Sequence, residues 1–392
     1  MEYITCLCRE DRKLLLLITS LSAFAHLLTH RLIKASAENL LKGGLFGIDL
    51  NKTTAKDYVA IKKQIRTKSL QTLLDTPSLK SRMIPESAGI IVGCAYISTV
   101  LVISWMANLP LLATHASMCS ITTMLLVGFV DDVLGLRWAL KIVFSVIACA
   151  PLVNSDASGR FLVLPVPFRG GIIQTICETI LPGPHAGFSL GLGYWHTVIV
   201  TLICVFCTNA INIYAGVNGL EAGQSVLISL NVIVYSFLHL TSSSEIHRFW
   251  NIALLQFPFI AVSTALFRLN MYPAKVFVGD SFTYFAGMVF AVTAISNTFS
   301  KTLMLFLIPQ ILNFLFSLPQ LFGFMHCPLH RIPRWDCHND RLVHSNNLTL
   351  LNAVLRCTGP LHEKSLTTLL LVLQAACGAL GLLLLELVRF FY

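Results

Sequence analysis

Long uncharged apolar runs alternate with short polar connections along most of this chain. Several runs reach the roughly 20 residues that an α-helix needs to cross the hydrocarbon core of a bilayer. A membrane β-barrel would instead show segments of about ten residues with alternating polarity, and the sequence has none. The pattern therefore predicts an all-α polytopic membrane protein. We expect about ten spans, at 14–33, 88–109, 111–130, 140–154, 195–214, 222–241, 249–267, 282–297, 300–324 and 365–391.

Composition supports a membrane protein. Of the 392 residues, 55% are hydrophobic and 12% are charged, about half the charged fraction of an ordinary soluble domain. The twelve cysteines lie mostly in apolar runs, where cysteine acts as a small hydrophobe, so no disulfide framework is predicted. The basic start of the first run resembles a signal peptide, but no small-residue cleavage site follows it, so we predict a retained span. Residues 1–392 are predicted to form one multi-pass domain.

The connection between the first two predicted spans determines the expected orientation. Residues 31–85 carry eleven Lys and Arg residues against four acidic ones, and cytoplasmic loops of membrane proteins are enriched in Lys and Arg. We therefore expect this connection, with its basic polar segment at about 53–83, to face the cytosol. The connections after the third, fifth, seventh and ninth spans, the last at about 325–364, then face the same side. Such loops explain the net charge of +9, and we exclude nucleic acid as a partner.

The distinctive polar sequences all fall in these same-side connections. The opposite connections are short and carry no comparable set, apart from a longer stretch at 155–193. One-sided clustering of this kind predicts a single active site on the cytosolic face, built from loops. The sequences are GIDLNK and IPESAG, DDVLGLRWALK, NIYAGVNGLEAG, YPAKVFVGDS and HCPLHRIPRWD.

Carboxylates at the ends of apolar runs are the first chemical clue. Asp131, Asp132 and Asp280 lie where an ionised carboxylate is costly unless it is paired, binds a metal or faces water. Asn212 adds an amide oxygen of the kind that Mg²⁺ accepts. Magnesium usually keeps substrate phosphate oxygens among its ligands, which indicates a phosphorylated substrate. Positive charge for a diphosphate is available from Lys141, His330, Arg331 and Arg334.

Each of these residues also has a purely structural interpretation. Asp131 and Asp132 would be solvated at a helix end, and Asp280 would be an ordinary helix cap. Lys141 would extend its ammonium group to the membrane–water interface, and Trp138 would anchor a helix at that interface. The loop residues His326, Cys327, His330, Cys337 and His338 are a possible zinc set, although their spacing does not match the usual zinc patterns.

Six sequence motifs in order give the chain a family resemblance: LNK, PES, FVDDVLGLRW, NAINIYAGVNGLEAGQS, VFVGDSFTYFAGM and HRIPR. From about residue 47 onward the chain resembles the polyprenyl-phosphate N-acetylhexosamine-1-phosphate transferases, in particular the eukaryotic members that use UDP-GlcNAc and dolichyl phosphate. The resemblance implies a Mg²⁺-dependent transferase in the endoplasmic reticulum membrane with its active site facing the cytosol. Its product would be GlcNAc-diphosphodolichol, the first lipid-linked intermediate of N-glycosylation. The implied partners are both substrates and membrane lipids; dimers occur in the family, and no feature of the sequence establishes one.

The resemblance also implies roles for the catalytic residues. Asp280 and Asn212 would hold Mg²⁺, with Asp131 and Asp132 beside it and Lys141 on the diphosphate. Which aspartate acts as a base, if either does, stays open, because a phosphate monoester is already largely ionised near neutral pH.

The substrate-binding side is implied by the same motifs. His330 and Arg331 would recognise the N-acetyl group in a pocket that Trp138 lines, and Arg334 would add positive charge. Leu50, Glu86 and Asn218 match the uridine-binding side.

The chain departs from the family pattern at several positions. Gly135 stands where the family has asparagine, Ala139 and Leu140 replace an Arg-His pair, and Leu329 replaces an arginine. The segment 53–83 is much longer than the usual connection, and we expect it to lie on the membrane surface. These departures keep open a catalytically weakened or regulatory homologue. Two further hypotheses are a bacterial-type member of the superfamily and, from a different class of protein, a membrane transporter.

Overall fold

The computed structural model describes most of the chain, and all structural statements below concern this part. The described residues are 9–53, 55–67, 72–73, 75–80, 82–109, 111–155, 161–163, 172–181, 183, 185–186, 189–240, 243–327 and 331–388.

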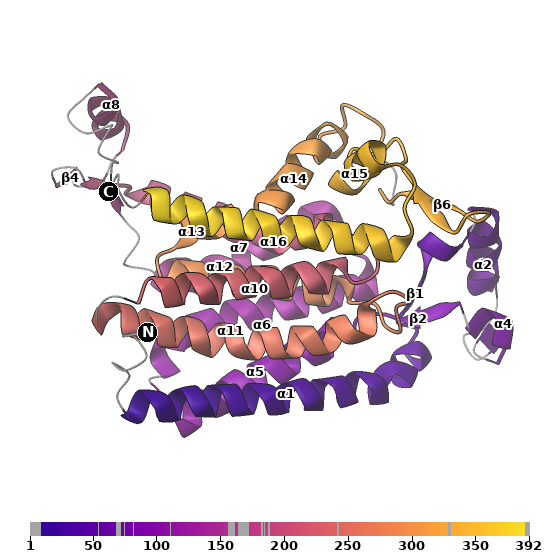
Figure 1. The fold of residues 1–392 in the computed structure, drawn as a ribbon, viewed down its shortest axis with the longest axis horizontal. Coiled ribbons are helices and arrows are strands. Elements are labelled where there is room, and N and C mark those ends of the chain that lie inside the picture. Colours follow the sequence, from indigo (N-terminus) through magenta and orange to yellow (C-terminus); the bar gives the residue numbers. More distant parts are fainter. Residues whose placement is uncertain are drawn as a thin grey trace.

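Long helices that run along a common axis form the body of the protein (Figure 1). They are α1 (Arg9–Lys42), α5 (Gly89–Met106), α6 (Leu111–Leu134), α7 (Trp138–Ser155), α9 (Tyr194–Ile213), α10 (Leu220–Leu238), α11 (Ser243–Asn270), α12 (Gly279–Ser296) and α16 (Glu363–Val388). Shorter helices connect or cover them: η2 (Leu50–Lys52), α2 (Ala55–Thr67), α4 (Pro77–Lys80), α8 (Ile172–Ile180), α13 (Ser300–Phe306), α14 (Ile308–Leu321) and α15 (Leu350–Thr358).

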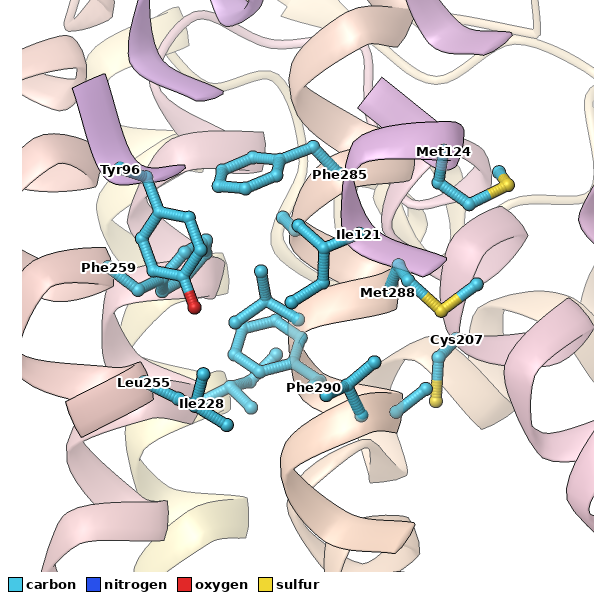
Figure 2. Close-up of a cluster of buried hydrophobic side chains, with 14 of the residues drawn as sticks. Tyr96, Ile121, Met124, Cys207, Ile228, Leu255, Phe259, Phe285, Met288 and Phe290 are labelled. Carbon is cyan, nitrogen blue, oxygen red and sulfur yellow. The ribbon is translucent and has the colours of Figure 1, made fainter. Parts of the chain in front are cut away.

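Helix α12 lies at the centre of the bundle. It packs against α5, α6, α9 and α11, and every residue from Ser281 to Ile295 is buried. Figure 2 shows Phe285, Met288 and Phe290 of α12 among side chains from the surrounding helices. The Tyr96 ring of α5 meets the Phe285 ring edge to face at 5.2 Å. A helix that is mostly apolar on all sides is typical of a central position in a large core or of a membrane span.

The helical, mostly apolar fold agrees with the predicted class, whereas the predicted number of spans is not confirmed. Within the described residues, seven helices are long and apolar enough to cross a membrane, or eight if one bent pair counts as a single span. The predicted spans at 140–154 and 282–297 do form helices, but α7 is short and α12 begins with the polar sequence GDSFTY.

The prediction of one continuous helix at 300–324 is wrong, because two helices with a bend between them form there. Helices α13 and α14 meet at a 74° bend, with Leu307 between them. Pro309 stands in the first turn of α14, where its missing N–H costs nothing because the first amides of a helix have no intrahelical partner. The proline therefore begins a new helix in a new direction.

Short strands gather at one end of the bundle, where α1 ends and α16 begins (Figure 1). Strand β1 (Phe46–Ile48) pairs antiparallel with β2 (Met83–Pro85), so Phe46 lies opposite Pro85. This pairing holds the two flanks of the long polar segment side by side, which keeps GIDLNK next to IPES. Strands β6 (Arg334–Asp336) and β7 (Arg341–Val343) form a second antiparallel pair.

The opposite end of the bundle carries the remaining sheet. Strand β5 (Ser189–Gly191) lies between β3 (Phe161–Val163) and β4 (His185–Ala186) in an antiparallel sheet. Helix α8 and strand β4 lie near the end of α16, far from β1 and β2 (Figure 1).

Candidate active site

A cavity of about 590 Å³ opens at the end of the bundle that carries β1 and β2. Its wall comes from connections that are far apart in the sequence, which supports the prediction that they meet at one site. Five of the predicted site residues line it: Leu50, Glu86, Asn212, Asn218 and Asp280.

Asp132 caps the helix that carries Asp280. Its Oδ1 accepts the backbone N–H of Asp280 at 2.6 Å, and its Oδ2 accepts that of Ser281 at 3.2 Å. A carboxylate at a helix N-terminus satisfies amides that lack intrahelical partners and complements the helix dipole. Both Asp132 oxygens are therefore used to position α12, rather than facing the cavity.

The approach of α6 to α12 depends on two glycines. A Cβ at Gly128 would lie 2.5 Å from the carbonyl oxygen of Asp280, so only glycine lets the helices come this close. Gly279 has φ of +74°, and a Cβ there would lie 2.5 Å from Asp132 Oδ2. The sequence GDS thus combines a left-handed backbone with close contact to the capping carboxylate.

Asp131 is part of a buried polar chain. Its Oδ2 lies 2.6 Å from Lys141 Nζ, and its Oδ1 accepts the backbone N–H of Leu136 at 2.9 Å. Lys141 Nζ also lies 3.5 Å from Asp280 Oδ2, so one ammonium group faces two carboxylates. The carboxyl groups of Asp131 and Asp280 lie within hydrogen-bonding reach of each other. Two carboxylates this close require shared positive charge, which Lys141 supplies from one side.

Tyr284 links this chain to Asn212, and sequence analysis did not identify it. Its hydroxyl donates to Asp131 Oδ2 at 2.9 Å and is also hydrogen-bonded to the Asn212 side chain. Because the hydroxyl proton goes to Asp131, Asn212 donates its amide N–H to the oxygen and keeps its own carbonyl oxygen available. The signal was present in the sequence, since Tyr284 follows Asp280 by four positions and shares its helix face.

Asp280 and Asn212 provide oxygen donors on the cavity wall. Among the described residues, no three His, Cys, Asp or Glu side chains form a metal-binding group. The geometry explains this, because Asp132 is engaged by α12 and Asp131 by Lys141. Magnesium commonly binds through one or two protein oxygens and completes its shell with water and substrate phosphate. The donor set of Asp280 and Asn212 therefore fits Mg²⁺.

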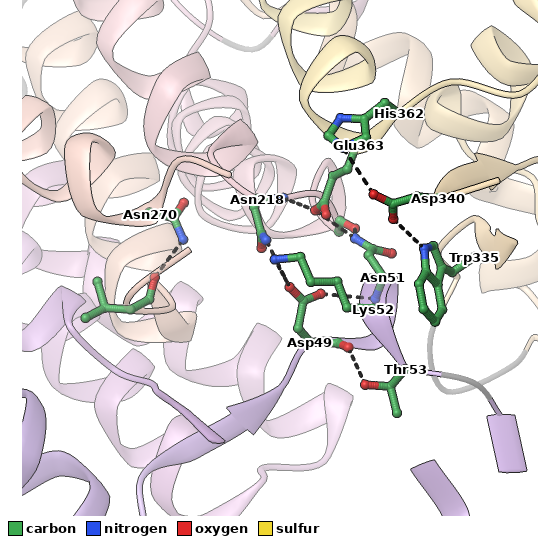
Figure 3. A network of polar contacts seen from close by, with 12 residues as sticks. Asp49, Asn51, Lys52, Thr53, Asn218, Asn270, Trp335, Asp340, His362 and Glu363 are labelled. Atoms are coloured by element: carbon green, nitrogen blue, oxygen red, sulfur yellow. Dashed lines mark hydrogen bonds and ion pairs between the residues drawn. The ribbon is translucent and has the colours of Figure 1, made fainter. Parts of the chain in front are cut away.

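A second polar network holds the cavity-lining residues Asp49, Asn51 and Asn218 in place (Figure 3). Glu363 Oε1 accepts the backbone N–H of Asn218 at 2.8 Å and the Asn51 side-chain N–H at 3.0 Å. Asp49 Oδ2 accepts the Asn218 side-chain N–H at 3.1 Å and lies 3.1 Å from Lys52 Nζ. The network joins η2, the connection before α10 and the start of α16. Asp49, Asn51 and Glu363 were not identified from sequence.

Glu86 lines the cavity beside the start of α12. Its backbone N–H donates to the Leu45 carbonyl oxygen at 3.0 Å, and the preceding strand residue, Pro85, accepts the backbone N–H of Phe277 at 2.7 Å. Burial, with a smaller contribution from the charge of Asp132, raises the pKa of Glu86 to about 7. The side chain is therefore part protonated near neutral pH.

The predicted basic loop is only partly described. His330 and Leu329 lie outside the described residues. Arg331 is half-buried with Nη1 lacking a hydrogen-bond partner among the described residues, and burial lowers its pKa. The next residue, Ile332, lines the cavity, whereas Arg334 is exposed on β6. Arg331 itself is not among the cavity-lining residues, so its predicted contact with substrate remains a prediction.

Trp138 is not brought to the cavity. It stands at the start of α7 with 58% of its surface exposed, and it is not among the cavity-lining residues. Its predicted place in an N-acetyl pocket remains a prediction. The zinc interpretation gains no support, since no metal-binding group is found in the described part of the chain, which omits His330.

Gly135 is a conservative departure from the family pattern. It has φ of +63° directly after α6, and its N–H donates to the Asp131 carbonyl oxygen at 2.8 Å. A Cβ there would meet nothing within 4 Å. Helices often end in a left-handed residue of this kind, usually glycine and sometimes asparagine, so both residues suit the same backbone.

Comparison with known proteins gives consistent matches. The family model of glycosyl transferase family 4 matches residues 115–298. The chain is 37% identical to a UDP-N-acetylglucosamine–dolichyl-phosphate N-acetylglucosaminephosphotransferase of Dictyostelium discoideum, over 91% of this chain and 85% of that protein. Proteins with the same name are 34% identical in Leishmania amazonensis, over 92% of this chain and 90% of the relative, and 36% identical in Saccharomyces cerevisiae, over 68% and 66%.

Proposed function

This chain belongs to the UDP-N-acetylglucosamine–dolichyl-phosphate N-acetylglucosaminephosphotransferases, and from that membership we propose that it transfers GlcNAc-1-phosphate from UDP-GlcNAc to dolichyl phosphate. The products are GlcNAc-diphosphodolichol and UMP, and the reaction is the first step of dolichol-linked oligosaccharide synthesis. The observation that carries the proposal is the convergence of Leu50, Glu86, Asn212, Asn218 and Asp280 on one cavity at a bundle end. A water-soluble nucleotide and a membrane-anchored phosphate can meet at such a boundary.

In the proposed reaction, an oxygen of dolichyl phosphate attacks the β-phosphorus of UDP-GlcNAc. The bond between that phosphorus and the oxygen bridging to the α-phosphorus breaks, and UMP leaves with the electron pair. The attacking group is already ionised near neutral pH, so the step needs no strong base. The full engagement of both Asp132 oxygens and of Asp131 favours positioning roles for these two residues.

We further propose that Asp280 and Asn212 hold Mg²⁺. When bound, the ion would neutralise the diphosphate and the charge that develops on the departing UMP. Lys141 holds Asp131 and Asp280 together and would contact the diphosphate from the other side. Arg331 would contribute positive charge next to the cavity, and Leu50, Glu86 and Asn218 would bind uridine.

Location and assembly are part of the proposal. The dolichyl-phosphate substrate in the relatives' names and the basic connection between α1 and α5 support an endoplasmic reticulum membrane protein whose cavity faces the cytosol. The homodimer that the family resemblance allows remains a prediction, which the mass of the purified protein in detergent would check.

The test is transfer of radiolabelled GlcNAc-1-phosphate from UDP-GlcNAc to dolichyl phosphate by purified protein. It is run with and without Mg²⁺, and with Asp280→Ala. We expect lipid-extractable label that requires both Mg²⁺ and Asp280. No label from a folded preparation that still binds UDP-GlcNAc would instead support a weakened homologue. Absence of both label and UDP-GlcNAc binding would overturn the proposal and favour a transporter.

A further inference from the structure

Helix α2, within the long segment between LNK and IPES, forms part of the cavity wall. Tyr58, Lys62 and Ile65 line the cavity together with the residues assigned above to substrate. Their spacing of four and three positions places them on one face of the helix. Helix α2 lies between LNK and IPES and outside the six motifs, so its residues are additional to those that carry the family resemblance.

Packing fixes which face of α2 meets the cavity. Ile61 is buried in an apolar cluster with Leu41 at the end of α1 and Met83 on β2. Ile65, on the cavity face, also packs against this cluster. The cluster therefore anchors α2 beside β1 and β2, and the helix presents Tyr58 and Lys62 to the cavity. Figure 1 shows α2 at the same end of the bundle as β1, β2 and β6.

Lys62 is a basic residue on a cavity wall whose other charged side chains, among the described residues, are acidic. Among the described lining residues, the acidic side chains are Asp49, Glu86, Glu221 and Asp280, and Lys62 is the one Lys or Arg. Lys52 pairs with Asp49 and Lys141 with Asp131 and Asp280, and neither lysine is among the residues that line the cavity. A nucleotide diphosphate that enters a wall of carboxylates needs positive charge on the wall itself.

The Lys62 ammonium is also held in place by its own helix. Its Nζ lies 5.5 Å from the centre of the Tyr58 ring, which is within the range of a cation–π contact. Tyr58 lies one turn before Lys62 on the same face and lines the same cavity. The ring therefore keeps the ammonium at the cavity rather than in open solvent.

We propose that Lys62 binds a phosphate group of the nucleotide sugar and that Tyr58 positions its ammonium. This inference rests on the proposed function and adds to it a substrate-binding residue from outside the shared motifs. A phosphate in this cavity could also belong to the lipid substrate. We assign Lys62 to the nucleotide because Leu50, Glu86 and Asn218, which line the same cavity, are the residues matched to uridine binding.

The test compares Lys62→Ala with Lys63→Ala in the full chain. Lys63 is the matched control, because it is on the same helix and does not line the cavity. We expect the KM for UDP-GlcNAc to rise about five- to ten-fold in Lys62→Ala, with kcat within about two-fold, as for loss of one charged contact to phosphate. Lys62→Arg should restore the KM, and Lys63→Ala should match the unmodified protein. Calorimetric binding of UDP should weaken in parallel.

The outcomes separate this inference from the proposed function. Inactivity of both the unmodified protein and Lys63→Ala would count against the transferase itself. Normal activity with the same KM and UDP affinity in Lys62→Ala would overturn the role of Lys62 alone. A raised KM for dolichyl phosphate with an unchanged KM for UDP-GlcNAc would overturn the assignment to the nucleotide. Tyr58→Ala should raise the KM for UDP-GlcNAc in the same direction as Lys62→Ala, because the ring that holds the Lys62 ammonium is removed.

Discussion

Asp132 accepts the backbone N–H of Asp280 at 2.6 Å, so the carboxylate that ends α6 fixes the start of the helix that carries the proposed metal ligand. Asp131 and Asp132 are adjacent in the sequence but have different partners. Asp131 faces Lys141 and Tyr284, whereas Asp132 faces the amides of α12. The difference gives separate expectations for stability and for catalysis.

Asp132→Asn should destabilise the protein more than Asp280→Asn does. The Asp132 substitution removes one of two acceptor oxygens and the charge at the helix N-terminus, a loss of about 1–3 kcal/mol in unfolding free energy. The Asp280 side chain is 30% exposed and faces the cavity, so Asp280→Asn should abolish transfer with little change in the unfolding midpoint. Thermal unfolding in detergent and transfer activity, measured for both variants, check these expectations. Equal midpoints for the two variants would contradict the capping role.

Tyr284→Phe should lower both stability and activity, whereas Tyr96→Phe should lower neither. Removing the Tyr284 hydroxyl takes a donor from buried Asp131 and costs about 1–3 kcal/mol. It also frees the Asn212 amide to turn, and we expect kcat to fall by at least about ten-fold. Tyr96 is equally buried, but its hydroxyl has no hydrogen-bond partner among the described residues, which makes it a matched control. Similar unfolding midpoints for the two variants would argue against the Asp131 contact.

Glu86→Gln should stabilise the protein at pH 8 and leave it unchanged at pH 4. Burial raises the pKa of Glu86 from its ordinary value of 4.5 to about 7. Between these values the folded state holds a proton that the unfolded state has lost, so stability falls as pH rises through this window. Above this pH window, the unfolding free energy is lowered by the full cost of burying the charged carboxylate, about 1–3 kcal/mol. Unfolding midpoints of the two proteins should coincide near pH 4 and diverge up to about pH 7. Parallel curves across the whole range would contradict the raised pKa.

Gly135→Asn should be tolerated, whereas Gly279→Asn should not. Both glycines have positive φ, but a Cβ at Gly135 meets nothing within 4 Å, and one at Gly279 would meet Asp132 and the backbone of Ser87. We expect Gly135→Asn to shift the unfolding free energy by less than about 1 kcal/mol, because asparagine adopts the left-handed conformation readily. Gly279→Asn should prevent assembly of the site. Expression yield, unfolding midpoint and transfer activity measure both. A loss of activity in Gly135→Asn would show that the side chain itself, and not the backbone, matters there.

The general arrangement of the site could be predicted from the sequence because membrane spans impose it. Spans that cross in alternation would bring every second connection to the same end, and the structure does bring Asn212, Asn218 and Asp280 to one cavity. The family motifs then predicted which of their polar residues bind substrate or metal. Of these, Asp280 and Asn212 line the cavity, and their roles stay predictions.

Other features depend on packing that periodicity does not encode. Glu363 directly precedes an apolar run and could have been an ordinary charged residue at a helix start, and its partner Asn51 is 312 residues away. The long polar segment was expected at the membrane surface, and its packing into the cavity wall depends on Ile61 and the β1–β2 pair. The bend at Leu307 was missed because hydropathy averages over a window that includes Pro309.

The contact between Asn51 and Glu363 also sets an order of events during synthesis. Chains grow at about 5–20 residues per second, so the Asn51 side chain emerges roughly 15–60 s before the carboxylate that will accept its hydrogen bond. Until α16 is inserted, the amide of Asn218 likewise lacks its partner. The hydrogen bonds that hold Asn51 and Asn218 at the cavity wall can therefore form only after the start of α16 has been made, so this part of the wall is among the later parts of the described chain to assemble.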